Sequence, residues 1–347
     1  MFESITSAIR PSTTNESAQQ GQFGLLSRAW RINSTLTIFT FLALLLTIIG
    51  VIGLIFDPRI VLGMPNWAKS TKFGLSLGLY GATLLWLLPL LQSRPRLAGF
   101  VGHASGGILS LEIVLLAVQA IRGVPMHFNV STPFDSTLWG FMSVTIMAFW
   151  VVTLIAVILA MLQPVSNRIL AWGVRLGLLI VLIGFAEGFL MPPPTPTQMA
   201  ALQAGQQVHL IGAHTVGAAD GGPGIPFLGW STQHGDLRVG HFIGIHGIQA
   251  IALLALLLMR RPEQWLTIRH RVTLVWIGAI SYLGLVVLVT WQALRGQPLL
   301  SPDTLTLTSL GGLIATGLIA TAIVFVHARR APAALSPDPS PMPGRGV

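Results

Sequence analysis

Residues 209–249 carry the densest set of side chains in this chain that could do chemistry. The segment reads HLIGAHTVGAADGGPGIPFLGWSTQHGDLRVGHFIGIHGIQ and holds five of the nine histidines. Imidazole groups together with carboxylates suit zinc, copper or iron, and a histidine can also be the axial ligand of haem b. The candidate metal or haem ligands are His209, His214, His234, His241 and His246.

The spacing of these histidines matches no known metal motif, because the HExxH, EF-hand and zinc-finger patterns do not occur. His241 and His246 are five residues apart, which places them about 140° apart around a regular helix. They therefore either serve different partners, or Gly240 and Gly244 mark a distorted helix start. The chain has no cysteine, which excludes thiolate-held metals, iron–sulfur clusters and covalently attached haem.

Two acidic residues, Glu112 and Glu187, lie within long apolar segments. Ionisable groups inside a membrane are costly and are functional candidates by default. Glu112 has two interpretations, a protonated hydrogen-bond donor between helices or a catalytic group. Glu187 stands beside Gly184 and Gly188, so it either snorkels from a closely packed helix or acts as a proton carrier or ligand. We take Glu112, Glu187 and His246 as the candidate catalytic residues.

Both lysines of the chain fall in the segment PNWAKSTKFGLSLGLY. Asn66 is expected to cap a helix and Trp67 to anchor it at the membrane interface. Lys69, Lys72 and Tyr80 share one helical stripe. The lysines either extend to lipid phosphates or form a positive wall for an anionic headgroup, a carboxylate or a quinone oxygen. On the second interpretation, these three residues bind substrate.

Polar loops supply three more candidates for substrate binding. His127 lies in the segment HFN, and Asp236 and Arg238 lie in HGDLR. His234, Asp236 and Arg238 alternate, so they share one face if the segment is extended. The run that begins at Asp220, DGGPG, is typical of a turn.

The composition predicts a membrane protein. The chain has 347 residues, of which 52% are hydrophobic and 9% are charged, whereas a soluble domain has roughly 25% charged residues. Several apolar runs exceed the ~20 residues that cross a bilayer. We expect an all-α bundle of about eight transmembrane helices in a lipid bilayer. The net charge of +9 then reflects topology and does not indicate nucleic-acid binding. The expected spans are 34–56, 73–92, 97–121, 137–163, 169–192, 241–259, 272–292 and 304–327.

Basic residues near the spans favour an orientation with both termini in the cytoplasm. In that orientation the inner segments hold twelve basic residues and the outer segments hold six. Residues 1–33 are then a polar tail, 34–328 the membrane domain and 329–347 a disordered tail. The Gly/His-rich loop 193–240 faces outward and caps an outer-leaflet pocket of His, Glu and Lys. Thr195 or Thr197 is expected to cap a short helix in this loop, which ends at Gly205.

The motifs WAKSTKF, HFN, GAHTVG, DGGPG, GWS, GDLRV and HFIGIHGIQ follow one another along the chain. In this order they resemble a family of bacterial multi-pass inner-membrane proteins with no assigned activity. The resemblance covers roughly residues 35–260. It implies a bacterial origin and a location in the inner membrane, and it implies no ligand.

Three functions follow from these residues. The first is a membrane oxidoreductase that uses haem b or a divalent metal (zinc, copper or iron) on a lipid-soluble or anionic small molecule. Glu187 would carry protons, and Lys69, Lys72 and Arg238 would hold an anionic part of the substrate. The second is a transporter or channel with the pocket as its vestibule. The third is a sensor or accessory subunit, either as a homo-oligomer or within a membrane complex.

Overall fold

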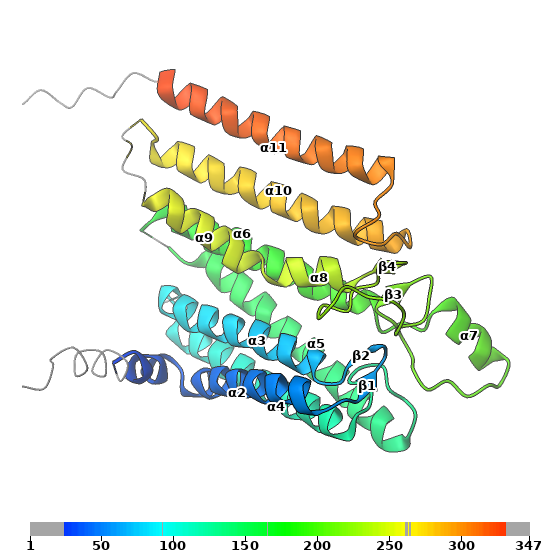
Figure 1. The fold of residues 1–347 in the computed structure, drawn as a ribbon. Coiled ribbons are helices and arrows are strands. Elements are labelled where there is room, and N and C mark those ends of the chain that lie inside the picture. The colour runs from blue at the N-terminus through cyan, green and yellow to red at the C-terminus, as the bar shows by residue number, and fades with distance from the viewer. Residues whose placement is uncertain (1–23, 92, 165, 261–262, 264, 331–347) are drawn as a thin grey trace, which may run out of the picture. The chain divides into compact units, whose positions relative to one another are not determined.

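The structure is a computed structural model that describes residues 24–330 apart from 92, 165, 261–262 and 264. The described chain is a set of long helices joined by short turns and one long loop (Figure 1). The predicted terminal tails lie mostly outside the described residues. The helices are α2 (Ser34–Phe56), α3 (Ala68–Leu87), α4 (Pro95–Arg122), α5 (Pro133–Leu162), α6 (Arg168–Glu187), α7 (Pro196–Gln203), α8 (Arg238–Ile245), α9 (Gly247–Met259), α10 (Ile268–Leu294) and α11 (Thr304–Arg330). The chain also has two short 3₁₀ helices, Leu88–Leu90 and Gly188–Leu190. Its strands have two residues each: β1 (Ile60–Val61), β2 (Met64–Pro65), β3 (Thr215–Val216) and β4 (Gly235–Asp236).

The protein is an all-α membrane protein, as predicted. Within the described residues, seven helices are long and apolar enough to cross a membrane, and there are eight spans if the bent pair α8–α9 counts as one. Their outward faces carry large apolar side chains, which suit lipid rather than water.

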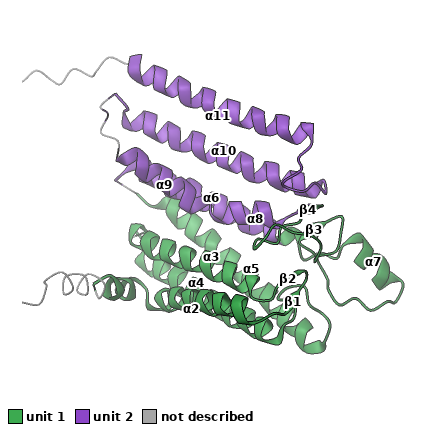
Figure 2. Cartoon of the chain, in the orientation of Figure 1, with its two compact units in different colours: residues 1–164, 189–234 green, residues 165–188, 235–347 purple. Residues whose placement is uncertain are grey.

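The chain forms two compact units that are not consecutive in sequence (Figure 2). Unit 1 comprises residues 1–164 and 189–234, and unit 2 comprises residues 165–188 and 235–347. In unit 1, α2 packs on α3 and α4, and α4 packs on α5. In unit 2, α6 packs on α8 and α9, and α10 packs on α6, α8, α9 and α11.

Helix starts follow the local sequence. The side chains of Asn33, Thr132 and Asn167 accept backbone N–H groups at the starts of α2, α5 and α6. Thr195 caps α7 in a capping box with Gln198, and Gly205 has a left-handed φ of 70° just beyond its end. The prediction of this short helix in the loop is confirmed.

The start of α3 differs from its prediction. The helix begins at Ala68, five residues before the expected position, and its N-cap residue Trp67 makes no side-chain capping bond. Asn66 donates instead to the carbonyl of Ala120 at 2.6 Å, at the end of α4. Trp67 is buried and donates from Nε1 to Asp57 at 2.7 Å, so it is not an interfacial anchor. Long-range bonds in this turn replace the local cap.

Asp57 organises the turn between α2 and α3. The guanidinium of Arg59 hydrogen-bonds its carboxylate and holds the pKa of Asp57 well below its usual range. The same guanidinium donates to the carbonyl of Ile121 at 3.0 Å. A positive side chain therefore satisfies the free carbonyl end of α4, where the helix dipole favours it.

The sixth predicted span is not one regular helix. It divides into α8 and α9, which meet at His246 with a bend of 40°. The hydroxyl of Tyr282, on α10, donates to the carbonyl of Ile243 at 2.7 Å beside this break. The helix is therefore distorted at His246, shortly after Gly240 and Gly244, and the carbonyl of Ile243 accepts from Tyr282 and from the backbone N–H of His246 there.

Candidate functional site

The strongest polar constellation lies on the loop face of unit 1, which we define as residues 57–69, 123–132 and 191–234. Backbone bonds join two of its loops, because Val130 donates to the carbonyl of His209 and Ile211 donates to the carbonyl of Phe128, both at 2.9 Å. Phe128 is buried and has a left-handed φ of 64°, a costly conformation for a residue with a side chain. This pairing brings the HFN and GAHT motifs together.

Asp220 fixes the imidazole of His214. Its Oδ2 lies 2.5 Å from His214 Nδ1, and its carboxylate also accepts the backbone N–H groups of His214 and Thr215. Burial alone would raise the pKa of Asp220, but the bonds and charge of His214 hold that pKa well below its usual range. Since a carboxylate only accepts, His214 donates from Nδ1, and its Nε2 is an acceptor when the ring is neutral.

Lys69 fixes the second imidazole of this face. Its Nζ lies 3.1 Å from His127 Nδ1. An ammonium group only donates, so His127 accepts at Nδ1 and carries its proton on Nε2. The rings of His127 and His214 are 6.3 Å apart between centroids. A base and a proton donor thus stand side by side.

Aromatic side chains surround the two imidazoles. The ring of Phe128 lies 4.8 Å from that of His214 and 5.0 Å from that of Trp139. The ring of Phe73 lies 5.8 Å from that of His127. His214 itself is only 7% exposed. The polar groups therefore work in surroundings that are partly shielded from water, where hydrogen bonds are stronger.

The other members of the lysine stripe have structural contacts. Lys72 Nζ donates to the carbonyl of Leu228 at 2.5 Å and so ties the long loop to α3. Tyr80 is buried and packs edge-on against Phe149 at 5.8 Å. Of the three predicted substrate-binding residues on α3, only Lys69 lies beside His127.

A second constellation surrounds Glu187 in unit 2. Thr290 Oγ1, on α10, lies 2.7 Å from Glu187 Oε1. His241 Nδ1, on α8, lies 2.7 Å from the carbonyl of Gly184, one turn before Glu187. Gly184 itself touches α8, because a Cβ built on it would lie 2.3 Å from the backbone of Gly244. The glycine therefore permits close packing, and His241 satisfies a carbonyl near the end of α6.

Other predicted residues of unit 2 are engaged locally. Asp236 is 2% exposed and binds Arg238 at two positions, Nε at 2.8 Å and a terminal nitrogen at 2.5 Å. This ion pair precedes α8 directly and is held within one short segment. His246 occupies the break itself, and its ring packs against Phe242 at 4.6 Å between centroids.

Glu112 has a partner on the neighbouring helix of unit 1. It is 4% exposed, and its Oε1 contacts the hydroxyl of Thr145 on α5. A carboxyl–hydroxyl contact between two spans is the arrangement expected of a helix–helix hydrogen bond. Glu112 therefore joins α4 to α5, away from the loop face.

The five histidines predicted as ligands do not form one set. Within residues 24–330, gaps aside, no three His, Asp or Glu side chains are grouped as metal ligands would be. The side chain of His209 is exposed, and its residue contributes to the loop pairing through its carbonyl. His234 donates its backbone N–H to Ser231. His209, His214 and His234 belong to unit 1, whereas His241 and His246 belong to unit 2.

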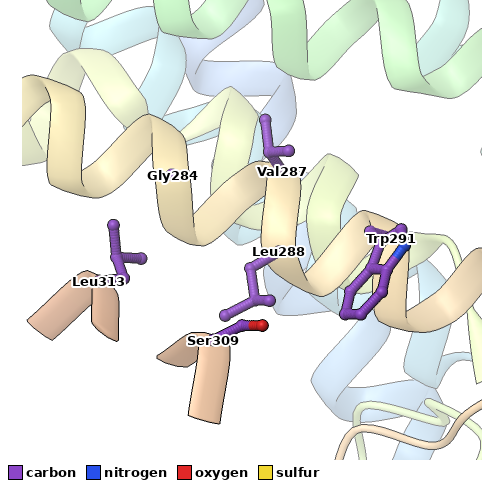
Figure 3. A pocket seen from close by; sticks show the side chains of 6 residues that line it. All are labelled: Gly284, Val287, Leu288, Trp291, Ser309 and Leu313. Atoms are coloured by element: carbon purple, nitrogen blue, oxygen red, sulfur yellow. The ribbon is translucent and has the colours of Figure 1, made fainter. Parts of the chain in front are cut away.

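An open groove of about 340 Å³ lies between α10 and α11 in unit 2 (Figure 3). The lining side chains that Figure 3 labels are mainly apolar, and Leu288, Leu313 and Trp291 dominate them. The one hydroxyl among its six lining residues, Ser309, donates to the carbonyl of Leu305 in its own helix. The groove therefore suits a lipid chain and offers no reactive group.

Two residues that complete these constellations are missing from the sequence-based set. Asp220 reads in sequence as part of a turn, and Thr290 as one polar residue in an apolar span. Only the spacing of six residues from His214 to Asp220 within a Gly-rich loop could have indicated the first. Thr290 is 103 residues from Glu187, so no local pattern connects them.

The chain matches no protein-family model, no curated protein and no solved structure. The geometry of these two constellations therefore carries the functional interpretation.

Proposed function

We propose that this integral membrane protein binds a small acidic or anionic molecule at the loop face of unit 1 and removes a proton from it. The observation that supports this proposal is the contact between Asp220 and His214. A carboxylate that holds Nδ1–H leaves Nε2 as the base and stabilises the imidazolium that forms, the arrangement used in many catalytic acid–base pairs. His214 is the proposed base.

Lys69 and His127 have a complementary role in the proposal. The Lys69 ammonium provides positive charge where the deprotonated molecule would carry negative charge. His127, held by Lys69 at Nδ1, offers Nε2–H as a hydrogen-bond donor. One ligand could therefore give a proton to His214 while its anionic form is stabilised by Lys69 and His127.

A quinol suits this chemistry, because it is lipid-soluble and has an acidic hydroxyl group. Its oxidation would complete the redox function expected from the sequence, with haem b or bound iron or copper as the electron acceptor. The described residues hold no grouping that fits such a metal, as stated above, so the proposal covers binding and deprotonation alone. A bacterial inner membrane with this face outward is part of the proposal, from the basic-residue pattern and the motif resemblance.

Binding can be measured with decylubiquinol and menadiol, the reduced forms of decylubiquinone and menadione, under argon on the purified protein in lipid nanodiscs. A bound aromatic ring of this kind quenches nearby tryptophan fluorescence, and the ring of Trp139 lies 5.7 Å from that of His127. We expect saturable quenching that Trp139→Phe reduces. His214→Ala and Lys69→Met should weaken binding by about tenfold or more, the loss expected for one charge-assisted bond.

His209→Ala is the matched control, because it removes an exposed histidine of the same loop. Its affinity for the quinols should equal that of the wild type. Unchanged affinity in both His214→Ala and Lys69→Met would refute the proposed site. A Soret band or stoichiometric iron or copper in the purified protein would support the redox extension.

Transport is the second candidate, and the broken span α8–α9 is the observation that favours it. Discontinuous helices line the substrate sites of many transporters, since their ends expose backbone groups inside the membrane. Solute uptake by proteoliposomes, compared between wild type and Tyr282→Phe, tests this candidate. If a membrane gradient drives no uptake of any solute class tested, the loop-face proposal is the better one.

A further inference from the structure

The carboxyl group of Glu187 lies against the backbone of α8, at a position where α8 has a glycine, Gly240, and no side chain. A Cβ added at Gly240 would lie 2.0 Å from Thr290 Oγ1 and 2.8 Å from Glu187 Oε2. The backbone of α8 therefore covers the carboxyl group directly. Glu187 Oε2 is buried and has no hydrogen-bond partner in the part of the chain that the structure describes.

The hydroxyl of Thr290 faces two oxygen atoms with a single hydrogen. Its Oγ1 lies 2.7 Å from Glu187 Oε1 and 2.9 Å from the carbonyl of Val286. A hydroxyl donates one hydrogen bond and can accept others. If its hydrogen points to Glu187, the carbonyl of Val286 receives none from it. If its hydrogen points to Val286, the contact with Glu187 needs a proton on the carboxyl group.

These two arrangements correspond to the two charge states of Glu187. An anion would receive the Thr290 hydrogen at Oε1 and keep a bare charge-bearing Oε2 in an apolar span, which is costly. A neutral acid would donate to Thr290, while Thr290 donates to Val286, and both bonds would be made. We propose that Glu187 is an exchangeable proton-binding site inside the membrane, in which Thr290 is the positioning residue that reorients with each proton.

The groups that face Glu187 come from three helices. From α8, the His241 ring lies 3.4 Å from the position of a Cβ on Gly188, the residue next to Glu187. Arg238, one turn earlier on α8, is bound to Asp236. From α10 the facing group is Thr290, and α6 supplies the carbonyl of Gly184 that His241 binds. His241 is thus a titratable neighbour of this segment of α6, and a charge on it would favour the ionised form of Glu187.

Glu112 provides a natural comparison. It also contacts a threonine, Thr145, whose Oγ1 lies 2.9 Å from the carbonyl of Met142. Glu187, and not Glu112, has a buried carboxylate oxygen without a partner among the described residues. The proposal concerns unit 2 and uses no residue of the loop face, so it stands independently of the quinone site.

Dicyclohexylcarbodiimide tests the proposal, since it reacts with protonated carboxyl groups in apolar surroundings. The carboxyl oxygen bonds to the central carbon of the reagent and the acid proton moves to a reagent nitrogen, so no group leaves. We expect mass spectrometry of the full-length protein in nanodiscs to find the adduct at Glu187. Its rate should fall by about tenfold or more between about pH 6 and pH 9, and Glu187→Gln should remove it.

Thr290→Val separates a positioning role from a merely structural one. Without the hydroxyl, Glu187 loses the partner that it has in both charge states, so the pH at which labelling falls should differ from that of the wild type by about one unit. Thr290→Ser, which keeps the hydroxyl, should restore the wild-type pH profile. Infrared spectroscopy provides a second measurement that does not depend on labelling. The carbonyl band of the protonated Glu187 should vanish in Glu187→Gln and persist in Glu112→Gln.

Three results would overturn the proposal. The first is an unlabelled Glu187 at every pH while the reagent labels other carboxyl groups of the same sample. The second is a pH profile that Thr290→Val leaves unchanged. The third is protection of Glu187 by Na⁺ at constant pH, which would make the site one for a metal cation instead of a proton.

Discussion

Asp220 Oδ2 lies 2.5 Å from His214 Nδ1, and the same carboxylate accepts the backbone N–H groups of His214 and Thr215. One side chain therefore folds the loop and sets the tautomer of the candidate base. Removal of its charge should affect both at once, which makes Asp220 the most informative position of the loop face.

Asp220→Asn should destabilise unit 1 by about 1.5–3 kcal/mol, because a buried charged acceptor loses its strongest hydrogen bonds. The thermal unfolding midpoint in detergent measures the change. Asp303→Asn is the matched control, since the ion pair of Asp303 with Arg295 is partly exposed and an asparagine can still accept the backbone N–H of Thr306 at the start of α11. Equal midpoints for the wild type and Asp220→Asn would contradict the proposed role of the carboxylate.

The stability that Asp220 contributes should depend on pH. Its pKa is lowered in the folded protein, so the native carboxylate stays charged at pH values where the unfolded one takes up a proton. The contribution is therefore complete above about pH 4 and is lost as the pH falls further. The difference in unfolding midpoint between wild type and Asp220→Asn, followed from neutral to acid pH, should shrink below that point. A difference that grows there would have the wrong sign.

Lys72→Met should loosen the turn around Leu228, because it removes the ammonium that binds the carbonyl there at 2.5 Å. Amide hydrogen exchange at residues 225–229 should become faster, while the helices of unit 1 keep their protection. Lys69→Met is the comparison, since Lys69 Nζ lies 3.1 Å from His127 Nδ1. Equal protection at 225–229 in both variants would show that Lys72 does not hold the loop.

Gly184→Ala should destabilise unit 2 by about 1–3 kcal/mol, because the added Cβ would lie 2.3 Å from the backbone of Gly244. Gly311→Ala, on α11, meets no atom within 4 Å and should be tolerated or stabilising. The thermal unfolding midpoints of both variants, compared with that of the wild type, measure these effects. A tolerated Gly184→Ala would mean that α6 and α8 do not approach this closely.

Tyr282→Phe should cost about 0.5–1.5 kcal/mol, since the carbonyl of Ile243 loses the hydroxyl that satisfies it at the break. Exchange of the amide groups around His246 should also become faster. Tyr80→Phe, at the other tyrosine of the chain, is the comparison and should leave exchange at His246 unchanged. Equal exchange rates at His246 in the wild type and Tyr282→Phe would show that the Tyr282 hydroxyl does not stabilise the break.

The spans were predictable because their signal is local. Each is a run of apolar residues longer than a bilayer requires, and the break in α8–α9 is marked by Gly240 and Gly244 at its start. The start of α3 close to Asn66 was predictable, but its bonding was not, because the expected side-chain cap is replaced by bonds from Asn66 to Ala120 and from Trp67 to Asp57. Those partners lie outside the window in which a capping pattern can be recognised.

Three side chains of the candidate site were predictable from the sequence, whereas Asp220 and the grouping of all four were not. Lys69, His127 and His214 stand out as polar groups in an apolar chain, but their proximity depends on backbone pairing between residues 128–130 and 209–211. His209, His214, His234, His241 and His246 are candidate ligands because they are dense in one segment of the sequence, and not because their spacing fits a metal motif. In the structure these histidines have different partners, such as Asp220 for His214 and the carbonyl of Gly184 for His241.

The discontinuous composition of unit 1 has a consequence for biosynthesis. His127 meets His214 only after residue 220 has left the ribosome, and by then α6, a helix of unit 2, has already been made. The loop face therefore cannot be complete before α6 has been synthesised. Until then Phe128, with its left-handed backbone, lacks its bond from Ile211, so completion of this face follows the synthesis of a helix of the other unit.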